Sequence, residues 1–210
     1  MKVTHVFADG GCILGNPSEY GGTYAWLHVD GPLNRKVEGR SGVVTNATFG
    51  ALVTNNAMEF LAVLRALEAL PDGWSGVVAS DSQCTITRWT GAKRDFKGIP
   101  WEWSDRMVTV LARLGELTWR QLAGHPTKLD LERGHKIKLV DGAVVEGLPV
   151  SEWQAACDRQ CTRLAQQYRD IHGIVREPPP PIIFEAGQSE AEKLAAGPFA
   201  ALAPLAAALP

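Results

Sequence analysis

The sequence predicts an α/β fold built on a mixed five-stranded sheet with helices on its faces. Short alternating or β-branched runs and apolar runs with helical spacing follow one another in the order βββαβααβα. The later strands are reached through helices, which is the connection that parallel strands require. The chain has 210 residues, 45% of them hydrophobic, which is enough to bury the core of one such domain.

The first three strands are expected to form an antiparallel meander. Residues 3–8 read as the first strand, which ends where Gly10-Gly11 breaks the run. Residues 20–29 read as the second, and the turn Asp30-Gly31-Pro32 leads into a third extended run over 33–45.

The remaining elements alternate between helices and strands. A helix is expected over 57–70, because apolar residues recur there at helical spacing and Pro71-Asp72-Gly73 ends the pattern. The elements expected after it are a strand over 76–80, a short helix capped by Asp81-Ser82 and ending near Trp89, a helix over 104–114, a strand over 117–122 and a long helix over 152–172.

The composition changes near residue 176, which predicts two parts. Residues 1–176 are expected to form the folded domain, and 177–210 a flexible tail. The tail begins with Pro178 to Pro181 and continues rich in alanine, so it is too poor in core-forming residues to order itself. Its apolar residues leave open that it docks an unknown protein.

The chain carries no run of about 18 apolar residues and no N-terminal apolar segment of the kind that directs secretion. We therefore expect a cytoplasmic protein with no membrane association, and a monomer. Its four cysteines show no disulfide-framework spacing, which indicates reduced thiols.

The net charge of −2 gives no general signature of nucleic-acid binding, so any such signal must be local. A basic loop follows Arg88, and tryptophans interleave with it or follow it. Its candidate contacts to phosphate and sugar are Lys93, Arg94, Lys97 and Trp101. The alternative is a solvated loop whose tryptophans cap the core.

Four acidic residues stand at the ends of apolar runs or inside helical ones. They are Asp9, Glu59, Asp81 and Asp158. Carboxylates from four separate elements are typical of a site for a hard cation such as Mg²⁺ or Mn²⁺. Each also has an ordinary interpretation: Glu59 as a residue favoured by the helix dipole, Asp81 as a helix cap and Asp158 as a surface acid.

An ordered set of fragments resembles the type 1 ribonucleases H. The fragments are Phe7 to Cys12 with Gly15-Asn16-Pro17 and Gly21-Gly22, Thr54 to Glu59, Ser80 to Gln83, Trp119 to His125, and Cys157-Asp158. The resemblance spans about residues 3 to 170. It implies an endonuclease that cuts the RNA strand of RNA–DNA hybrids, leaving 5′-phosphate and 3′-hydroxyl ends.

The resemblance also implies a mechanism and a set of site residues. Two Mg²⁺ ions, for which Mn²⁺ is expected to substitute, would be held by Asp9, Glu59, Asp81 and Asp158. Asn16, Asn56 and Gln83 match positions at which the family contacts the minor groove, where the 2′-hydroxyl distinguishes RNA from DNA.

The sequence departs from the family pattern in three places. His125 matches the mobile catalytic histidine of the family, but residues 126–150 form an insertion whose His135 is a rival for that role. Gln154 stands where an asparagine is expected, and residues 45–52 form a second insertion.

Two other functions remain open on the residues alone. One is a DNA nuclease or resolvase with the same fold, and the other is a hybrid-binding module with weak catalysis. The presence of all four carboxylates disfavours the binding module, whereas the nuclease or resolvase would be distinguished by its cutting of DNA that lacks ribose.

Overall fold

A computed structural model describes residues 2–92, 95–140 and 143–175. Residues 1–174 cluster as one unit and 175–210 as another, and nearly all of the second lies outside the described residues. The tail expected over 177–210 therefore stays a prediction. None of the described helices combines the length and the apolar character that crossing a lipid bilayer requires.

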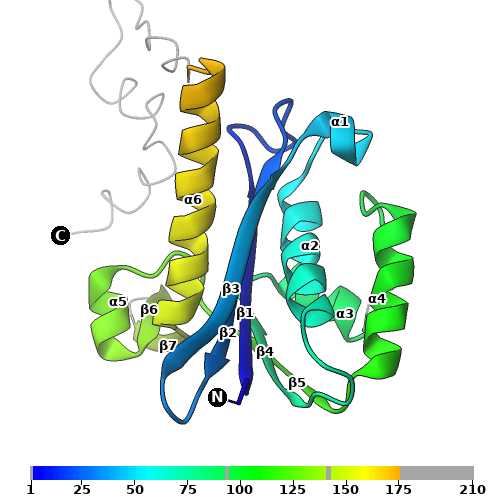
Figure 1. The fold of residues 1–210 in the computed structure, drawn as a ribbon. Helices are drawn as coiled ribbons and strands as arrows, with labels where there is room; N and C mark the ends of the chain where they lie inside the picture. Colours follow the sequence, from blue (N-terminus) through cyan, green and yellow to red (C-terminus); the bar gives the residue numbers. More distant parts are fainter. Residues whose placement is uncertain (1, 93–94, 141–142, 176–210) are drawn as a thin grey trace, which may run out of the picture. The chain divides into compact units, whose positions relative to one another are not determined.

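The expected mixed five-stranded sheet is confirmed (Figure 1). Its order is β3-β2-β1-β4-β5, in which β1 to β3 form the antiparallel meander while β4 pairs in parallel with both β1 and β5. The bounds are β1 His5–Cys12, β2 Gly22–Asp30, β3 Arg35–Val44, β4 Gly76–Ser80 and β5 Leu117–Gln121. Because β1 and β4 run in parallel, their carboxyl ends meet at the same edge of the sheet.

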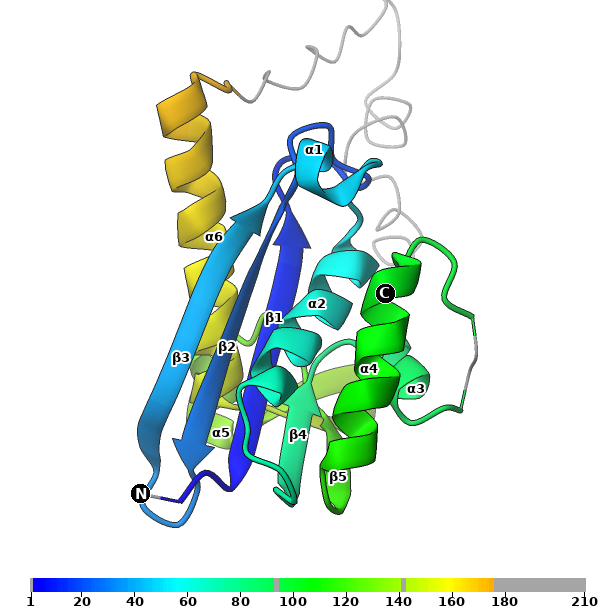
Figure 2. The same cartoon turned by 45° about the vertical axis from the view of Figure 1, so that its right-hand side comes forward.

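Helices cover both faces of this sheet (Figures 1 and 2). Helices α2, α3 and α4 lie on one side, and α6 packs against β1 and β2 on the other. Their bounds are α1 Asn46–Phe49, α2 Asn55–Glu68, α3 Gln83–Trp89, α4 Trp101–Arg113, α5 Lys128–Arg133 and α6 Glu152–His172. Helix α4 begins three residues before the expected Ser104.

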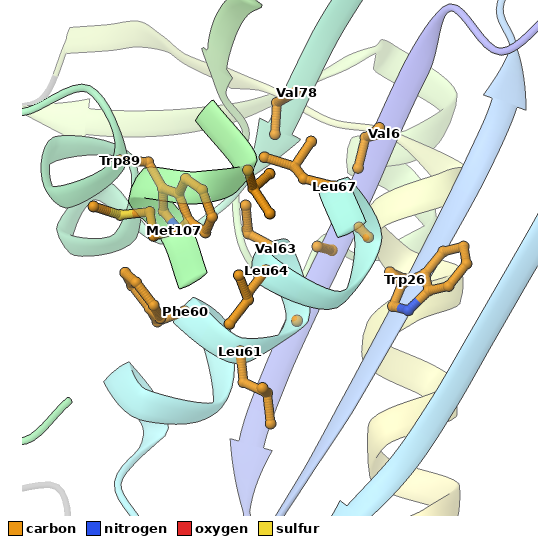
Figure 3. Packing of buried hydrophobic residues seen from close by; sticks show 14 of the residues in the cluster. Val6, Trp26, Phe60, Leu61, Val63, Leu64, Leu67, Val78, Trp89 and Met107 are labelled. Carbon is orange, nitrogen blue, oxygen red and sulfur yellow. The ribbon is translucent and has the colours of Figure 1, made fainter. Parts of the chain in front are cut away.

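The main core surrounds α2, which is apolar on nearly every side (Figure 3). The Thr54 side chain caps this helix by accepting a hydrogen bond from the backbone N–H of Ala57. Phe60 stacks on Trp89 with ring centroids 5.2 Å apart, and Trp89 stacks on Trp119 at 5.9 Å. The packing on every side fixes the position of α2, and with it the acidic residue that α2 carries.

The expectation that Gly10-Gly11 breaks the first strand is wrong, because β1 continues to Cys12. A Cβ atom on Gly10 would lie 2.3 Å from the carbonyl carbon of Met58 and 2.5 Å from the amide nitrogen of Glu59. The glycine therefore serves the close approach of β1 to the backbone of α2, which needs no turn.

Both insertions are folded. The first contains α1, whose Phe49 contacts Trp103 of α4 edge-on at 5.4 Å. The second contains α5 and a two-stranded antiparallel hairpin, β6 His135–Val140 and β7 Ala143–Pro149. The sequence pattern alone assigns no element to either insertion.

Candidate active site

The four acidic residues come from four different parts of the chain and meet beside the middle of β1, where the neighbouring strand β4 ends. Asp9 lies in β1, Glu59 in α2, Asp81 just after β4, and Asp158 in α6. The pKa of Asp9 is raised well above its ordinary value, first by burial and then by the negative charges of Asp81, Asp158 and Glu59. That electrostatic coupling shows that the carboxylates share one neighbourhood.

Asp9 is the buried member at the centre of the cluster. Its carboxylate Oδ1 accepts a hydrogen bond of 2.9 Å from the backbone N–H of Gly10, which partly offsets the rise in its pKa. Its backbone carbonyl accepts a contact of 3.4 Å from the Cys161 Sγ of α6. Strand β1 and helix α6 are thereby joined directly at the acidic residue.

Glu59 occupies the second turn of α2, so its position is not explained by attraction to the helix N-terminus. Burial raises its pKa to about 7, and the charge of Asp81 contributes to the rise. The Thr85 hydroxyl donates a hydrogen bond of 3.5 Å to Oε2, and the buried Arg88 opposes the rise.

Asp81 does not cap α3, because the side chain of Ser82 makes that hydrogen bond. Burial raises the pKa of Asp81, and Asp158 adds to the rise while His125 and Gln154 oppose it. A Cβ atom on Gly124 would lie 2.7 Å from Asp81 Oδ2, so the backbone before His125 passes directly over this carboxylate.

Gln154 replaces the expected asparagine and bridges two strands at the site. Its Nε2 donates hydrogen bonds to the carbonyl of Ala8, at 3.2 Å, and to Asp81 Oδ1, at 3.0 Å. Both partners only accept, which fixes the orientation of the amide. The side chain is 2% exposed, and its Oε1 has no hydrogen-bond partner within the described residues. The sequence marks position 154 only as a departure from the family pattern, and the two hydrogen bonds place its glutamine at the carboxylates.

The two candidate histidines lie in different surroundings. His125 has a left-handed backbone, with φ of 47°, and its side chain is 82% exposed. Its Nδ1 is 3.4 Å from Asp158 Oδ1. His135 instead faces Glu146 across the β6–β7 hairpin, with its Nδ1 3.7 Å from Oε1. The histidine beside the carboxylates is therefore His125.

The predicted minor-groove residues lie on segments that border the cluster. Asn16 Oδ1 accepts a hydrogen bond of 3.2 Å from the backbone N–H of Asn55, and Asn55 Oδ1 accepts one of 2.8 Å from the N–H of Cys12. These bonds tie the loop after β1 to the start of α2. Asn56 and Gln83 are exposed at the first turns of α2 and α3.

The predicted phosphate contacts fall on the loop between α3 and α4. Lys97 is exposed, and its backbone N–H donates to Asp95 Oδ1 at 3.0 Å. Trp101 is an exposed residue at the start of α4. Lys93 and Arg94 lie outside the described residues.

The cluster suits a hard cation in its donor chemistry, since carboxylate oxygens are the ligands that Mg²⁺ and Mn²⁺ prefer. Within residues 2–92, 95–140 and 143–175, however, no three or more His, Cys, Asp or Glu side chains are arranged to hold a metal ion as they stand. The pKa values of Asp9, Glu59 and Asp81 remain raised although Arg88 lowers that of Glu59 and His125 lowers that of Asp81. The residues thus fit a cation that draws the side chains together on binding.

Known proteins with sequences similar to this chain are named as ribonucleases H. A Shewanella sp. (strain ANA-3) protein named Ribonuclease H is 32% identical over 146 residues, covering 63% of this chain and 83% of the relative. A ribonuclease H of Erwinia tasmaniensis is also 32% identical, with 63% of this chain and 84% of the relative covered. The chain belongs to the ribonuclease H family. It is a ribonuclease H hydrolase, and the resemblance seen in the sequence is confirmed.

Comparisons with protein-family models and with solved structures add no further argument. No protein-family model matches this ribonuclease H. A crystal structure of RNase H1 from Halobacterium salinarum NRC-1 aligns with a TM-score of 0.47 and 22% identity, covering 57% of this chain and 85% of that one.

Proposed function

We propose that this ribonuclease H is an endonuclease that cuts the RNA strand of RNA–DNA hybrids with two bound divalent cations, leaving 5′-phosphate and 3′-hydroxyl ends. The observation that carries the proposal is the meeting of Asp9, Glu59, Asp81 and Asp158 beside one strand end. Carboxylates that burial and mutual repulsion make difficult to ionise are well suited to bind a cation.

Asp9, Glu59, Asp81 and Asp158 would hold the ions, with Asp9 as the shared ligand because it is coupled to the other three. When bound, two Mg²⁺ or Mn²⁺ ions would activate a water molecule and stabilise the departing oxygen of the phosphodiester. No side chain of the cluster then needs to act as a covalent nucleophile.

Other residues of the site would orient groups and move protons. Gln154 holds the Asp81 carboxylate against β1 through its two hydrogen bonds. His125 is exposed beside Asp158, where its imidazole can carry a proton to the leaving oxygen or assist product release. Because its loop passes over Asp81, a small movement of that loop would bring the imidazole over the cluster.

Choice of the RNA strand would rest on amide side chains around the cluster. Asn16, Asn56 and Gln83 can each donate to and accept from a 2′-hydroxyl. The Asn55 hydrogen bonds fix the position of the Asn16 loop, so the first two amides would be presented together. Lys97 and Trp101, with Lys93 and Arg94, would contact phosphates and sugars of the hybrid.

The test is cleavage of end-labelled RNA–DNA hybrid, duplex DNA and duplex RNA, with Mg²⁺ and with EDTA. We expect cutting of the RNA strand of the hybrid only, dependent on Mg²⁺, and its loss in Asp9→Asn, which removes the shared carboxylate but keeps the side-chain volume. Calorimetric titration with Mg²⁺ should show binding to the unaltered protein that Asp9→Asn loses. Activity of Asp9→Asn within tenfold of the unaltered enzyme, or cutting of DNA lacking ribose, would contradict the proposal.

A further inference from the structure

The β6–β7 hairpin is anchored to the segment that carries the candidate catalytic histidine. The backbone N–H of Ala123 donates to the carbonyl of Pro149 at 2.8 Å, and that of Val150 donates to the carbonyl of Gly134 at 3.3 Å. The Lys136 ammonium donates to the carbonyl of Gly124 at 3.3 Å. The hairpin is therefore held at its base, beside the backbone that passes over Asp81.

The two faces of this hairpin differ in character. Between its first two cross-strand pairs, β6 advances two residues, from His135 to Ile137, while β7 advances three. The extra residue of this bulge therefore lies on β7, and side chains alternate regularly between the two faces along β6. Lys138 consequently shares the face on which Lys136 reaches toward Gly124. The opposite face carries the cross-strand pair Leu139 and Val144, which are 73% and 68% exposed.

The lysine face has no acidic counterpart on the hairpin's described strands. Strand β6 contains no acidic residue, and Glu146 of β7, which belongs to the other face with its partner Ile137, lies 3.7 Å from His135. Of the cations on β6, Lys136 reaches the backbone of Gly124, which lies over Asp81 of the acidic site, in a chain whose net charge is −2. Such a local arrangement suits a polyanion that must be brought to that site.

We infer that the Lys136 and Lys138 face of the β6–β7 hairpin is a second phosphate-binding surface for the hybrid substrate. This inference rests on the proposed function. Figure 1 shows α5, β6 and β7 to the left of β1 and helix α3 to its right. The hairpin would then bind the duplex beside His125, next to which Lys136 is anchored. The basic loop that follows α3 would bind the duplex at a separate place.

The experiment measures hybrid affinity by fluorescence anisotropy from 50 to 200 mM KCl. Every protein carries Asp9→Asn, so that the hybrid stays intact. The test variant is Lys138→Gln, because Lys138 is exposed and makes no anchoring bond, and Lys138→Arg restores the charge. Lys2→Gln is the matched control, because Lys2 is exposed and precedes the first residue of β1, whereas Asp9 lies farther along that strand.

Removing one phosphate contact should reduce the slope of log affinity against log salt by about 0.9. Over this fourfold salt range, the parent protein should lose about 3.5-fold more affinity than Lys138→Gln does. Lys138→Arg and Lys2→Gln should retain the parent slope. Lys136→Gln is a second variant that should also reduce the slope, and it removes the anchoring bond to Gly124 as well.

Equal slopes for the parent, Lys138→Gln and Lys136→Gln would overturn the inference while leaving the proposed function intact. The inference also fails if Leu139→Ser with Val144→Ser weakens hybrid binding and the lysine variants do not, because the apolar face would then be the contact. A parent protein that binds no hybrid at any salt concentration would overturn both the inference and the proposed function.

Discussion

Replacing Glu59 by glutamine should stabilise the metal-free protein, and more so at higher pH. Burial raises the pKa of Glu59 from 4.5 to about 7, so the folded state holds this proton more tightly than the unfolded state does. The resulting contribution to stability is fully present below pH 4.5 and is lost as the pH rises through 7. Glutamine cannot ionise, so the variant avoids that loss.

The size of the effect follows from the two pKa values. Relative to a side chain that stays neutral, the raised pKa costs about 1 kcal/mol of folding free energy at pH 5, where the carboxyl ionises only in the unfolded state, and about 3 kcal/mol at pH 8. The advantage of Glu59→Gln should therefore grow by about 2 kcal/mol between these pH values, or by about 4 to 8 °C in Tm for a domain of this size. The hydrogen bond from Thr85 can persist, because the amide oxygen still accepts it.

The assay is urea or thermal unfolding in EDTA at pH 5 and pH 8, with Glu116→Gln as the control. Glu116 is exposed just before β5, at the end of the sheet away from the cluster, so its replacement should change stability by less than about 0.5 kcal/mol at both pH values. Added Mg²⁺ should stabilise the unaltered protein more than Glu59→Gln. A variant that is less stable than the unaltered protein at pH 8, or whose advantage does not grow with pH, would refute the reasoning.

Two further predictions concern side chains around the cluster. His125→Ala should lower kcat by roughly ten- to a hundredfold, while Mg²⁺ binding measured by calorimetry is retained. His135→Ala should lower kcat by a smaller factor. The reverse order would assign the proton-transfer role to the hairpin histidine. Gln154→Met keeps the volume but removes both hydrogen bonds, so it should cost about 1 to 3 kcal/mol of stability in urea unfolding and lower kcat more than it raises KM. Gln154→Asn should retain more activity than Gln154→Met, and equal losses in the two would argue against a positioning role.

Much of the fold can be predicted because hydrophobic period and turn residues agree along the chain. The strand expected over 76–80 has the observed bounds, and so does the helix expected over 152–172. The acidic residues stand out for a related reason, since a carboxylate at the end of an apolar run has to find a partner. Spacing along the sequence does not show which of these carboxylates meet, because that depends on the order of the strands in the sheet. The family resemblance supplies this grouping.

The inserted hairpin escapes the sequence prediction although a signal for it is present. Asp141-Gly142 stands between two runs rich in apolar residues, 135–140 and 143–149, which is a strong short-range hairpin pattern. The insertion has no counterpart in the family pattern, so the resemblance gives no guidance there. Lys136 and Lys138 share one face because side chains alternate between the two faces of β6. The hydrogen bond from Lys136 to Gly124 is indicated by no local sequence pattern.

The role of Gly10 connects the core to the chemistry. Because this residue has no side chain, β1 approaches the backbone of α2 at Met58 and Glu59, and Asp9 is brought next to Glu59. Burial is the largest cause of both raised pKa values, and the charge of Glu59 adds to the rise at Asp9. The apolar packing around α2 holds the cluster together against this repulsion. A cation bound there would find its ligands already held on rigid elements, with little but side-chain rotation left to complete the site. A methyl group at position 10 would push α2 away from β1, so it would weaken both the site and the packing. Replacing one of the four carboxylates, in contrast, affects the site and leaves the packing unchanged.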